Sequence, residues 1–351
     1  MGVFDRLRIW RARERYMPLP RRIRSGTTAL IAIAVIVVAL TIGLVLERGN
    51  TPRDAAMIAW AEAHATDPVQ LIERATRTRP VLLLGDVVGA PAPKRLAATL
   101  IDTLGMAGRL EAVGLEVPAD QQTWIDLYLE TDPEDASVLL AHPRTIREDE
   151  GAGRAMLQVY RAVWRVNRAL GANRRIRIIA LDPSAWPPPP GISPARALAV
   201  FAQRDSIMQA TLDARLFDRS ARPRVLVFVD GLHVQKSGAR LATGGIAPAT
   251  VEWLGARLAN RGVPIFTVIV DAARGTGAPS PVAGHRAGPL YSLLRANLSI
   301  PAAGLAFPLT GSAAPTADWL ASPTGPGVGF QRLPADPRLE GRIDAWVILP
   351  N

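Results

Sequence analysis

The sequence predicts an α/β domain with a mainly parallel central sheet flanked by helices, preceded by one N-terminal transmembrane helix. Three observations support this fold class. Short continuous apolar runs alternate with helical patterns, which is typical of parallel strands buried on both faces. One much longer apolar run carries no charge. Hydrophobic residues make up 48% of the 351 residues, which is enough to form a sizeable core.

The longest apolar run extends from Thr27 to Leu46 and predicts a membrane-spanning helix. At about 1.5 Å per residue it measures about 30 Å along a helix, which matches the hydrocarbon core of a bilayer. The run is longer than the apolar region of a signal peptide, and no Ala-x-Ala pattern follows it. We therefore expect an uncleaved, single-pass anchor in the cytoplasmic (inner) membrane.

The arginines around this run predict its orientation. Eight arginines lie in residues 1–25, whereas only Arg48 and Arg53 closely follow the apolar run. The positive-inside rule then places the N-terminus in the cytoplasm and the main domain on the periplasmic or extracytoplasmic side. We expect the basic segment Arg6–Arg24 to contact anionic lipid headgroups. A nucleic-acid-binding or partner-binding arm is the less common alternative.

The rest of the chain is nearly neutral. Residues 1–25 contribute +6 of the formal charge of +10, so the remainder does not indicate nucleic-acid binding. Cysteine is absent, which excludes disulfides, thiol catalysis and thiolate metal ligands. The expected layout is a basic tail (1–26), a transmembrane helix (27–46), a linker with a helical lead-in (47–79) and the α/β domain (80–351).

The elements of the domain follow from capping signals and apolar runs. Thr51-Pro52 and Asp67-Pro68 each place a capping side chain before a proline and predict two helix starts. Strands are expected at Val81–Leu84, Ala112–Leu115, Ile176–Leu181, Val225–Val229, Ile265–Val270 and Ala345–Leu349. Helices are expected at Pro93–Met106, Asp120–Leu129, Arg154–Leu170, Pro194–Phe217 and Pro248–Ala259. The Pro- and Gly-rich stretches 187–190 and 272–289 are expected to be loops.

Acidic residues stand at or near the ends of five of these strands. They are Asp86, Glu116, Asp182, Asp230 and Asp271, and His233 follows three residues after Asp230. Because the carboxyl ends of parallel strands meet at one edge of a sheet, we expect acids and an imidazole to converge on one cleft. Crowded carboxylates and an imidazole are suited to proton transfer. The candidate site consists of Asp86, Glu116, Asp182, Asp230 and His233.

A structural explanation exists for most of these acids. A carboxylate after a strand commonly caps the next helix, and Asp182 and Asp271 fit that role. His233 could equally be a loop histidine bonded to Asp230. Glu116 does not fit a capping role, because it lies inside the strand end GLEVPAD and needs a buried partner.

Several common motifs are absent. The sequence has no Gly-x-Gly-x-x-Gly, no Gly-Lys-Ser/Thr and no Gly-x-Ser-x-Gly. It also lacks His-Glu-x-x-His, and its four histidines give no basis for a metal site. No cofactor can be identified from the sequence.

The strand-end residues resemble those of the erythromycin-esterase-like and haem-uptake (ChaN/Tiki-like) superfamily. The resemblance rests on VLLLGDVVGAP, AVGLEVPADQQTWIDLYL, IIALDP and VLVFVDGLHVQKSG. It implies an α/β fold in which Asp86, Glu116, Asp182 and His233 occupy the Glu, Glu, Asp and His positions of the family. Three features differ, and one is that the His-Asn-x-His pattern of the family reads Asp230-Gly231-Leu232-His233 here. Asp86 is shorter than the family glutamate, and Val88 and Gly89 stand where the family has a histidine.

This departure leaves two functional hypotheses. The first is a ligand-binding or weakly hydrolytic domain with a degenerate acid/His site and an unidentified small-molecule ligand. The alternative is an active periplasmic hydrolase in which Glu116 or Asp86 acts as the base and His233 as the acid or stabiliser.

Overall fold

The computed structural model describes residues 52–146, 150–171, 174–189, 191–220, 222–243, 246–272, 289–309, 331–333 and 341–350. The chain divides into two compact units, Met1–Ala56 and Met57–Asn351, and the domain described below belongs to the second. The predicted transmembrane helix, the basic tail and almost all of the predicted loop 272–289 lie outside the described residues. Among the helices that are described, none is both long and apolar enough to cross a membrane.

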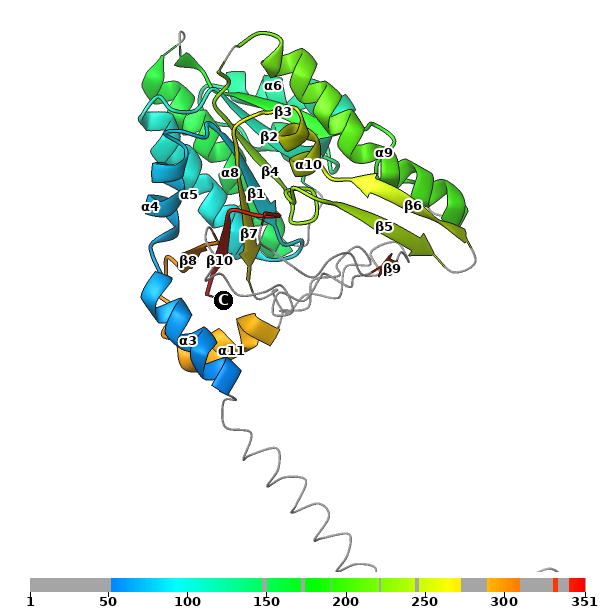
Figure 1. Ribbon diagram of the computed structural model, residues 1–351. Helices are drawn as coiled ribbons and strands as arrows, with labels where there is room; N and C mark the ends of the chain where they lie inside the picture. Colours follow the sequence, from blue (N-terminus) through cyan, green and yellow to red (C-terminus); the bar gives the residue numbers. More distant parts are fainter. Residues whose placement is uncertain are drawn as a thin grey trace, which may run out of the picture. The chain divides into compact units, whose positions relative to one another are not determined.

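A seven-stranded sheet forms the centre of the domain, with the strand order β3-β2-β4-β1-β7-β10-β8 (Figure 1). The strands are β1 (Val81–Asp86), β2 (Ala112–Pro118), β3 (Arg177–Asp182), β4 (Val225–Asp230), β7 (Ile265–Asp271), β8 (Leu305–Pro308) and β10 (Ala345–Ile348). All neighbouring pairs are parallel except β10 and β8. The mainly parallel sheet is therefore confirmed, and each of the six predicted apolar runs forms one of its strands.

Nine helices are described around this sheet. They are α3 (Pro52–His64), α4 (Pro68–Ala75), α5 (Pro91–Met106), α6 (Gln122–Glu130), α7 (Ser137–Leu140), α8 (Glu150–Leu170), α9 (Pro194–Leu212), α10 (Leu254–Asn260) and α11 (Pro289–Asn297). A 3-10 turn at Ala119–Gln121 precedes α6, and a π-helical turn at Asp213–Phe217 extends α9. The predicted cap Asp67 accepts a hydrogen bond from the Gln70 amide at 2.9 Å, as expected for a helix start.

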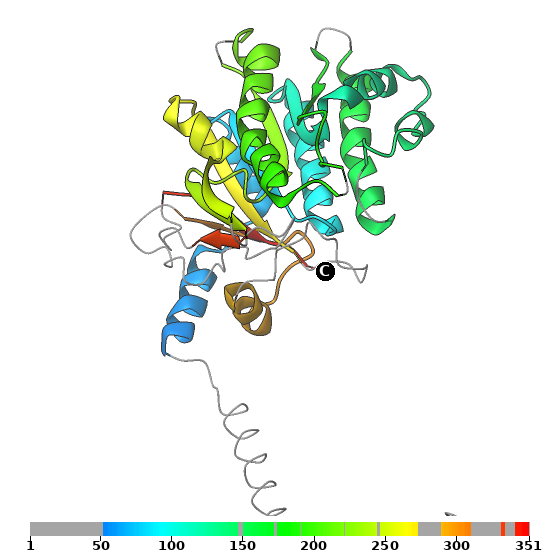
Figure 2. The same ribbon diagram turned by 90° about the vertical axis from the view of Figure 1, so that its right-hand side faces the viewer.

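Helices cover both faces of the sheet (Figures 1 and 2). Helices α5 and α8 pack on the face that receives Leu82 and Leu84 of β1. Helices α9 and α10 pack on the opposite face, which receives Val81 and Leu83. Successive residues of a strand point to opposite faces, so a strand covered on both sides is apolar at every position.

A small antiparallel sheet with the order β6-β5-β9 lies beside the main one. Its strands are β5 (Gly238–Thr243), β6 (Ile246–Glu252) and β9 (Gln331–Leu333). The prediction of a helix over Pro248–Ala259 is therefore wrong in its first half, because the helix α10 begins only at Leu254. Val251 and Trp253 are buried and alternate with less buried neighbours, which is the period of a strand. Pro248 is compatible with β6 because β6 is an edge strand.

Candidate functional site

Four neighbouring strands of the main sheet carry an acidic residue of the candidate site at their carboxyl ends, at the last position of β1, β3 and β4 and two residues before the end of β2. Along the strand order, these residues are Asp182 on β3, Glu116 on β2, Asp230 on β4 and Asp86 on β1. Asp86 and Asp230 are register partners, and Pro118 of β2 is the register partner of Asp182. The sheet therefore brings the four acids to one edge, as the sequence predicts.

Arg204 of α9 connects two of these acids. Its Nε donates to Asp182 Oδ1 at 3.0 Å, and its Nη2 donates to the same oxygen at 2.7 Å. Nη2 also donates to Glu116 Oε1. The guanidinium lies over the Trp186 ring, 4.0 Å from the ring centroid, and its side chain is 3% exposed. A buried guanidinium needs such a set of acceptors, and a planar fork can satisfy two carboxylates at once.

Asp182 is a buried ion-pair partner rather than a helix cap. Its side chain is fully buried against Arg204. Burial raises the pKa of Asp182, although the Arg204 guanidinium acts in the opposite direction. The capping role expected for Asp182 is thus replaced by an ion pair inside the domain.

Glu116 is the member of this group that reaches solvent. Its side chain is 23% exposed, and its Oε2 accepts a hydrogen bond from the Asp230 amide at 2.7 Å. Burial raises the pKa of Glu116, but Arg204 and His233 outweigh it and hold the pKa below its usual range. Glu116 is therefore an ionised carboxylate at neutral pH, and it is held in place from two sides.

His233 lies beneath this edge and is 1% exposed. Its Nδ1 is 2.8 Å from Asp205 Oδ1, and its Nε2 is 3.3 Å from Arg204 Nη1. Asp205 Oδ1 also accepts the Leu254 amide at 2.6 Å. Burial lowers the pKa of His233, but the Asp205 carboxylate more than offsets this and raises the pKa to about 9. Since protonated His233 has no acceptor to offer, its approach to Arg204 at neutral pH is a contact between two donors.

Asp86 is neutralised by a lysine. Lys94 of α5 is fully buried, and its Nζ lies 2.9 Å from Asp86 Oδ1 and 2.8 Å from Oδ2. The same Nζ donates to the Val87 carbonyl at 3.0 Å. An ammonium group therefore lies at the Val87 carbonyl, which precedes Val88 and Gly89, where the resemblance implies a histidine.

Asp230 and Asp271 have local roles. Asp230 Oδ1 accepts the Leu232 amide at 2.9 Å, and the His233 amide donates to the Asp230 carbonyl at 2.9 Å, so this acid shapes the turn after β4. Asp271 accepts a hydrogen bond from the Trp346 indole at 2.9 Å. His233 bonds to Asp205 and not to the Asp230 side chain that the sequence suggested.

Three residues of this cluster were not predicted from the sequence, Arg204, Asp205 and Lys94. The first two lie on α9 among Phe201, Met208 and Leu212, which face the core. Charged residues at core-facing helical positions are expensive unless they are paired, and this pattern in FAQRDSIMQATL indicates a buried ion pair.

The residues at this edge do not fit the haem or metal site that the family resemblance raises. No group of three or more His, Cys, Asp or Glu side chains in the described ranges is placed to hold a metal ion. The position of the family histidine is taken by Val88 and Gly89, and Asp86 is held by Lys94.

Two solved structures have a similar fold. One is erythromycin esterase EreC, in a histidine-to-asparagine variant in its open conformation, with a TM-score of 0.53 and 12% identity over 82% of this chain and 97% of that chain. The other is a Bacillus cereus protein with a TM-score of 0.54 and 12% identity over 85% of this chain and 97% of that chain. No protein-family model and no curated protein sequence matches the chain.

These likenesses establish the fold. The domain has an erythromycin-esterase-like α/β fold, which confirms that part of the resemblance seen in the sequence. The haem-uptake part finds no support among these structures.

Proposed function

We propose that the protein is a membrane-anchored, extracytoplasmic domain that binds a small molecule at the acidic edge of its sheet, with a site poorly equipped for hydrolysis. The observation that carries this proposal is the position of His233. A general acid or base must come within hydrogen-bond reach of the atom it protonates or deprotonates. His233 is 1% exposed, and its two ring nitrogens face Asp205 and Arg204.

The two candidate bases are also restrained. A general base is most effective when its pKa lies near the working pH, and the pKa of Glu116 is lowered by Arg204 and His233. Asp86 is held by the Lys94 ammonium. The alternative, an active hydrolase, therefore requires a rearrangement that frees Glu116 from Arg204 and brings His233 to the surface.

The charges at this edge favour one class of ligand. Carboxylates outnumber cationic groups in the cluster formed by Asp86, Glu116, Asp182, Asp205, Asp230, Lys94, Arg204 and His233. The partly exposed groups among them, Glu116, Asp86 and Asp230, are all carboxylates. We propose that the ligand is cationic or rich in hydrogen-bond donors, and that Glu116 is its main contact.

The test uses the full chain in neutral-detergent micelles with two probes, the diamine putrescine and the ester p-nitrophenyl acetate. We expect calorimetry to detect putrescine binding that weakens about tenfold or more in Glu116→Gln, since a charge-assisted hydrogen bond is lost. Glu130→Gln, which removes an exposed carboxylate from α6, should bind like the wild type. Ester hydrolysis should stay at the rate of buffer alone.

Two results would contradict the proposal. Hydrolysis above background that is lost in Glu116→Gln but kept in Glu130→Gln would establish the hydrolase alternative. Equal putrescine binding in all three proteins would exclude Glu116 as the ligand contact.

Membrane attachment is part of the same proposal. Its support comes from the uncharged segment Thr27–Leu46 and from the arginines that precede it. We propose that this segment holds the domain on the extracytoplasmic face of the cytoplasmic membrane. The tail Arg6–Arg24 would then contact anionic lipid headgroups on the opposite leaflet.

A further inference from the structure

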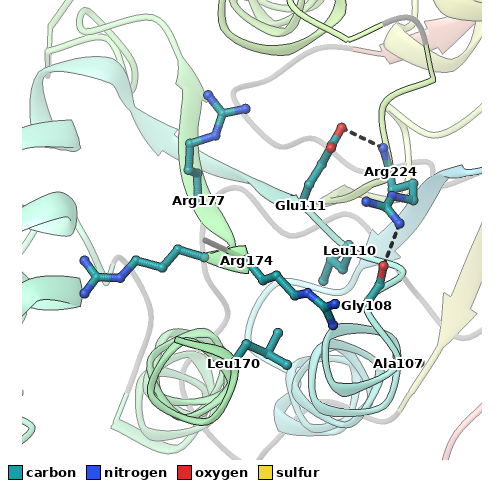
Figure 3. Close-up of a pocket in the computed structure, with 9 residues that line it drawn as sticks. Ala107, Gly108, Leu110, Glu111, Leu170, Arg174, Arg177 and Arg224 are labelled. Atoms are coloured by element: carbon teal, nitrogen blue, oxygen red, sulfur yellow. Dashed lines mark hydrogen bonds between the residues drawn. The ribbon is translucent and has the colours of Figure 1, made fainter. Parts of the chain in front are cut away.

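A hollow of about 580 Å³ lies at the other edge of the main sheet, where β2, β3 and β4 begin (Figure 3). Four arginines line it, Arg174, Arg175, Arg177 and Arg224, together with the single carboxylate Glu111. The candidate site described above is at the carboxyl ends of the same strands. The two sites are therefore on opposite edges of the domain.

The hollow remains positive after its local negative charges are counted. Helices α5 and α8 both end here, at Met106 and Leu170, and each helix C-terminus contributes roughly half a negative charge. Together with Glu111, these ends offset about two of the four guanidinium charges. Glu111 Oε1 accepts the backbone amide of Arg224 at 3.0 Å, as drawn in Figure 3.

The guanidinium groups of the hollow keep hydrogen-bond donors to spare. Arg224 Nη1 donates to the Gly108 carbonyl at 2.6 Å, and Arg177 Nη1 donates to the Arg215 carbonyl at 3.2 Å. Both acceptors are neutral, and each guanidinium carries five N–H donors. The two arginines are thus fixed in position while most of their donors remain free for a ligand.

Arg174 and Arg175 are exposed, and their guanidinium groups form no hydrogen bond or ion pair with residues that the structure describes. Some other exposed arginines of this domain form ion pairs with carboxylates. Arg165, for example, is 2.7 Å from Asp102, and Arg144 is 2.6 Å from Asp120. The hollow thus collects several guanidinium groups that have no carboxylate partner, and this arrangement favours an anionic ligand.

We propose that this hollow, called here the arginine pocket, binds a phosphate-bearing small molecule. Guanidinium groups bind phosphoryl oxygens in pairs of parallel hydrogen bonds, and several arginines around one concavity can enclose a phosphate from more than one side. The volume is within the range of small-molecule sites. The phosphoryl group can belong to a free metabolite or to a phospholipid headgroup.

The test measures binding of inorganic pyrophosphate to the full chain in neutral-detergent micelles by calorimetry. The pocket variant Arg174→Gln/Arg175→Gln removes two exposed charges that form no hydrogen bond or ion pair with described side chains, so the fold is expected to persist, as thermal unfolding will verify. The control Arg95→Gln/Arg196→Gln removes two exposed arginines from α5 and α9. We expect one saturable site that weakens about tenfold or more in the pocket variant and is retained in the control.

A third variant, Arg174→Lys/Arg175→Lys, keeps the charge but removes the fork geometry, so it should bind with intermediate affinity. The basic tail is identical in all of these proteins, so its attraction for anions cancels in the comparison. The absence of saturable binding in the wild type, or equal weakening in the pocket and control variants, would overturn the proposal.

A second measurement distinguishes a phospholipid headgroup from a free phosphate compound as the ligand. The pyrophosphate titration is repeated with phosphatidylglycerol added to the micelles. Competition that requires Arg174 and Arg175 identifies a lipid headgroup as the ligand. Unchanged pyrophosphate binding identifies a free phosphate compound.

Discussion

Arg204 pairs with two acids of the strand-end cluster. One guanidinium holds Glu116 and Asp182 and contacts His233. Burial lowers the pKa of Arg204, but Asp182 and Glu116 raise it above the ordinary arginine value. Removing such a cation would leave two carboxylates without their partner inside the domain, which is far more costly than losing an exposed ion pair.

The raised pKa of His233 makes the stability of the folded domain depend on pH. Its pKa is about 9 in the folded state, compared with about 6.5 for an unperturbed histidine. The resulting stabilisation is on the order of 3 kcal/mol; it is complete below about pH 6.5 and is lost as the pH rises through about 9. We expect the Tm difference between wild type and His233→Gln to shrink between pH 6.5 and pH 9.5. A difference that stays constant over this interval would show that His233 is not charged in the folded protein.

At the scale of the elements, helix α9 carries Arg204 and Asp205, two residues of the candidate site that could not be predicted from the sequence. Glu116 was recognisable as an acid that needs a partner, because it lies inside a strand end and cannot cap a helix. Its partner is 88 residues away on a helix of another layer, and nothing local in the sequence joins the two. The four strand-end acids could be predicted because parallel strands share one direction, whereas Arg204 and Asp205 depend on how α9 is rotated against the sheet.

The strands of the main sheet were predictable for a similar reason. Each is buried on both faces and is therefore a continuous apolar run. The β5–β6 hairpin was missed because Pro248 was interpreted as the first residue of a helix. The Gly244-Gly245 pair that precedes β6 is a hairpin signal, and the alternation from Thr250 to Trp253 supports a strand.

The start of α10 fits closely against the turn that carries His233. The Gly255 amide donates to the His233 carbonyl at 2.8 Å. A Cβ at Gly255 would lie 2.3 Å from the Val234 carbonyl oxygen and 2.7 Å from that of Gln235, and both are backbone atoms. We expect Gly255→Ala to lower the free energy of unfolding by about 2–4 kcal/mol, which thermal or denaturant unfolding can measure.

Gly105→Ala is the matched control for this substitution. The three atoms nearest to a Cβ at Gly105 are side-chain methyl groups of Ile176 and Val166, at 2.9–3.3 Å, and not backbone atoms. The loss in free energy of unfolding should be smaller than at Gly255, on the order of 1–2 kcal/mol, because side chains give way more easily than backbone and alanine also favours the helix. Equal effects at the two glycines would mean that α10 is not held against the His233 turn.

At the scale of the whole molecule, the two edges of the sheet have opposite character. Acids collect where the parallel strands end, and arginines collect where three of those strands begin. The parallel arrangement separates the two groups by the length of a strand, so each edge can bind a ligand of different charge. The two proposed sites can accordingly be tested independently of each other.

The proposed membrane orientation can be tested with single cysteines, because the sequence contains none. Ala141→Cys places an exposed thiol on the domain, and Ser25→Cys places one in the basic tail. In intact cells a membrane-impermeant maleimide should label Ala141→Cys, whereas Ser25→Cys should react only after the cells are lysed. Labelling in the reverse order would place the domain in the cytoplasm. If neither thiol is labelled before lysis, neither segment is exposed on the outer side of the membrane.

The order of the strands also affects how the chain is made. Strand β4 lies between β1 and β2, and the hydrogen bond from Asp230 to Glu116 joins residues 114 positions apart. At a synthesis rate of about 5–20 residues per second, β1 and β2 wait roughly 5–30 s for the strand that joins them. During that interval the nascent chain carries two open strand edges and the uncovered apolar faces of α5 and α8. We expect a ribosome-bound fragment that ends before Val225 to expose these edges and apolar faces to other molecules.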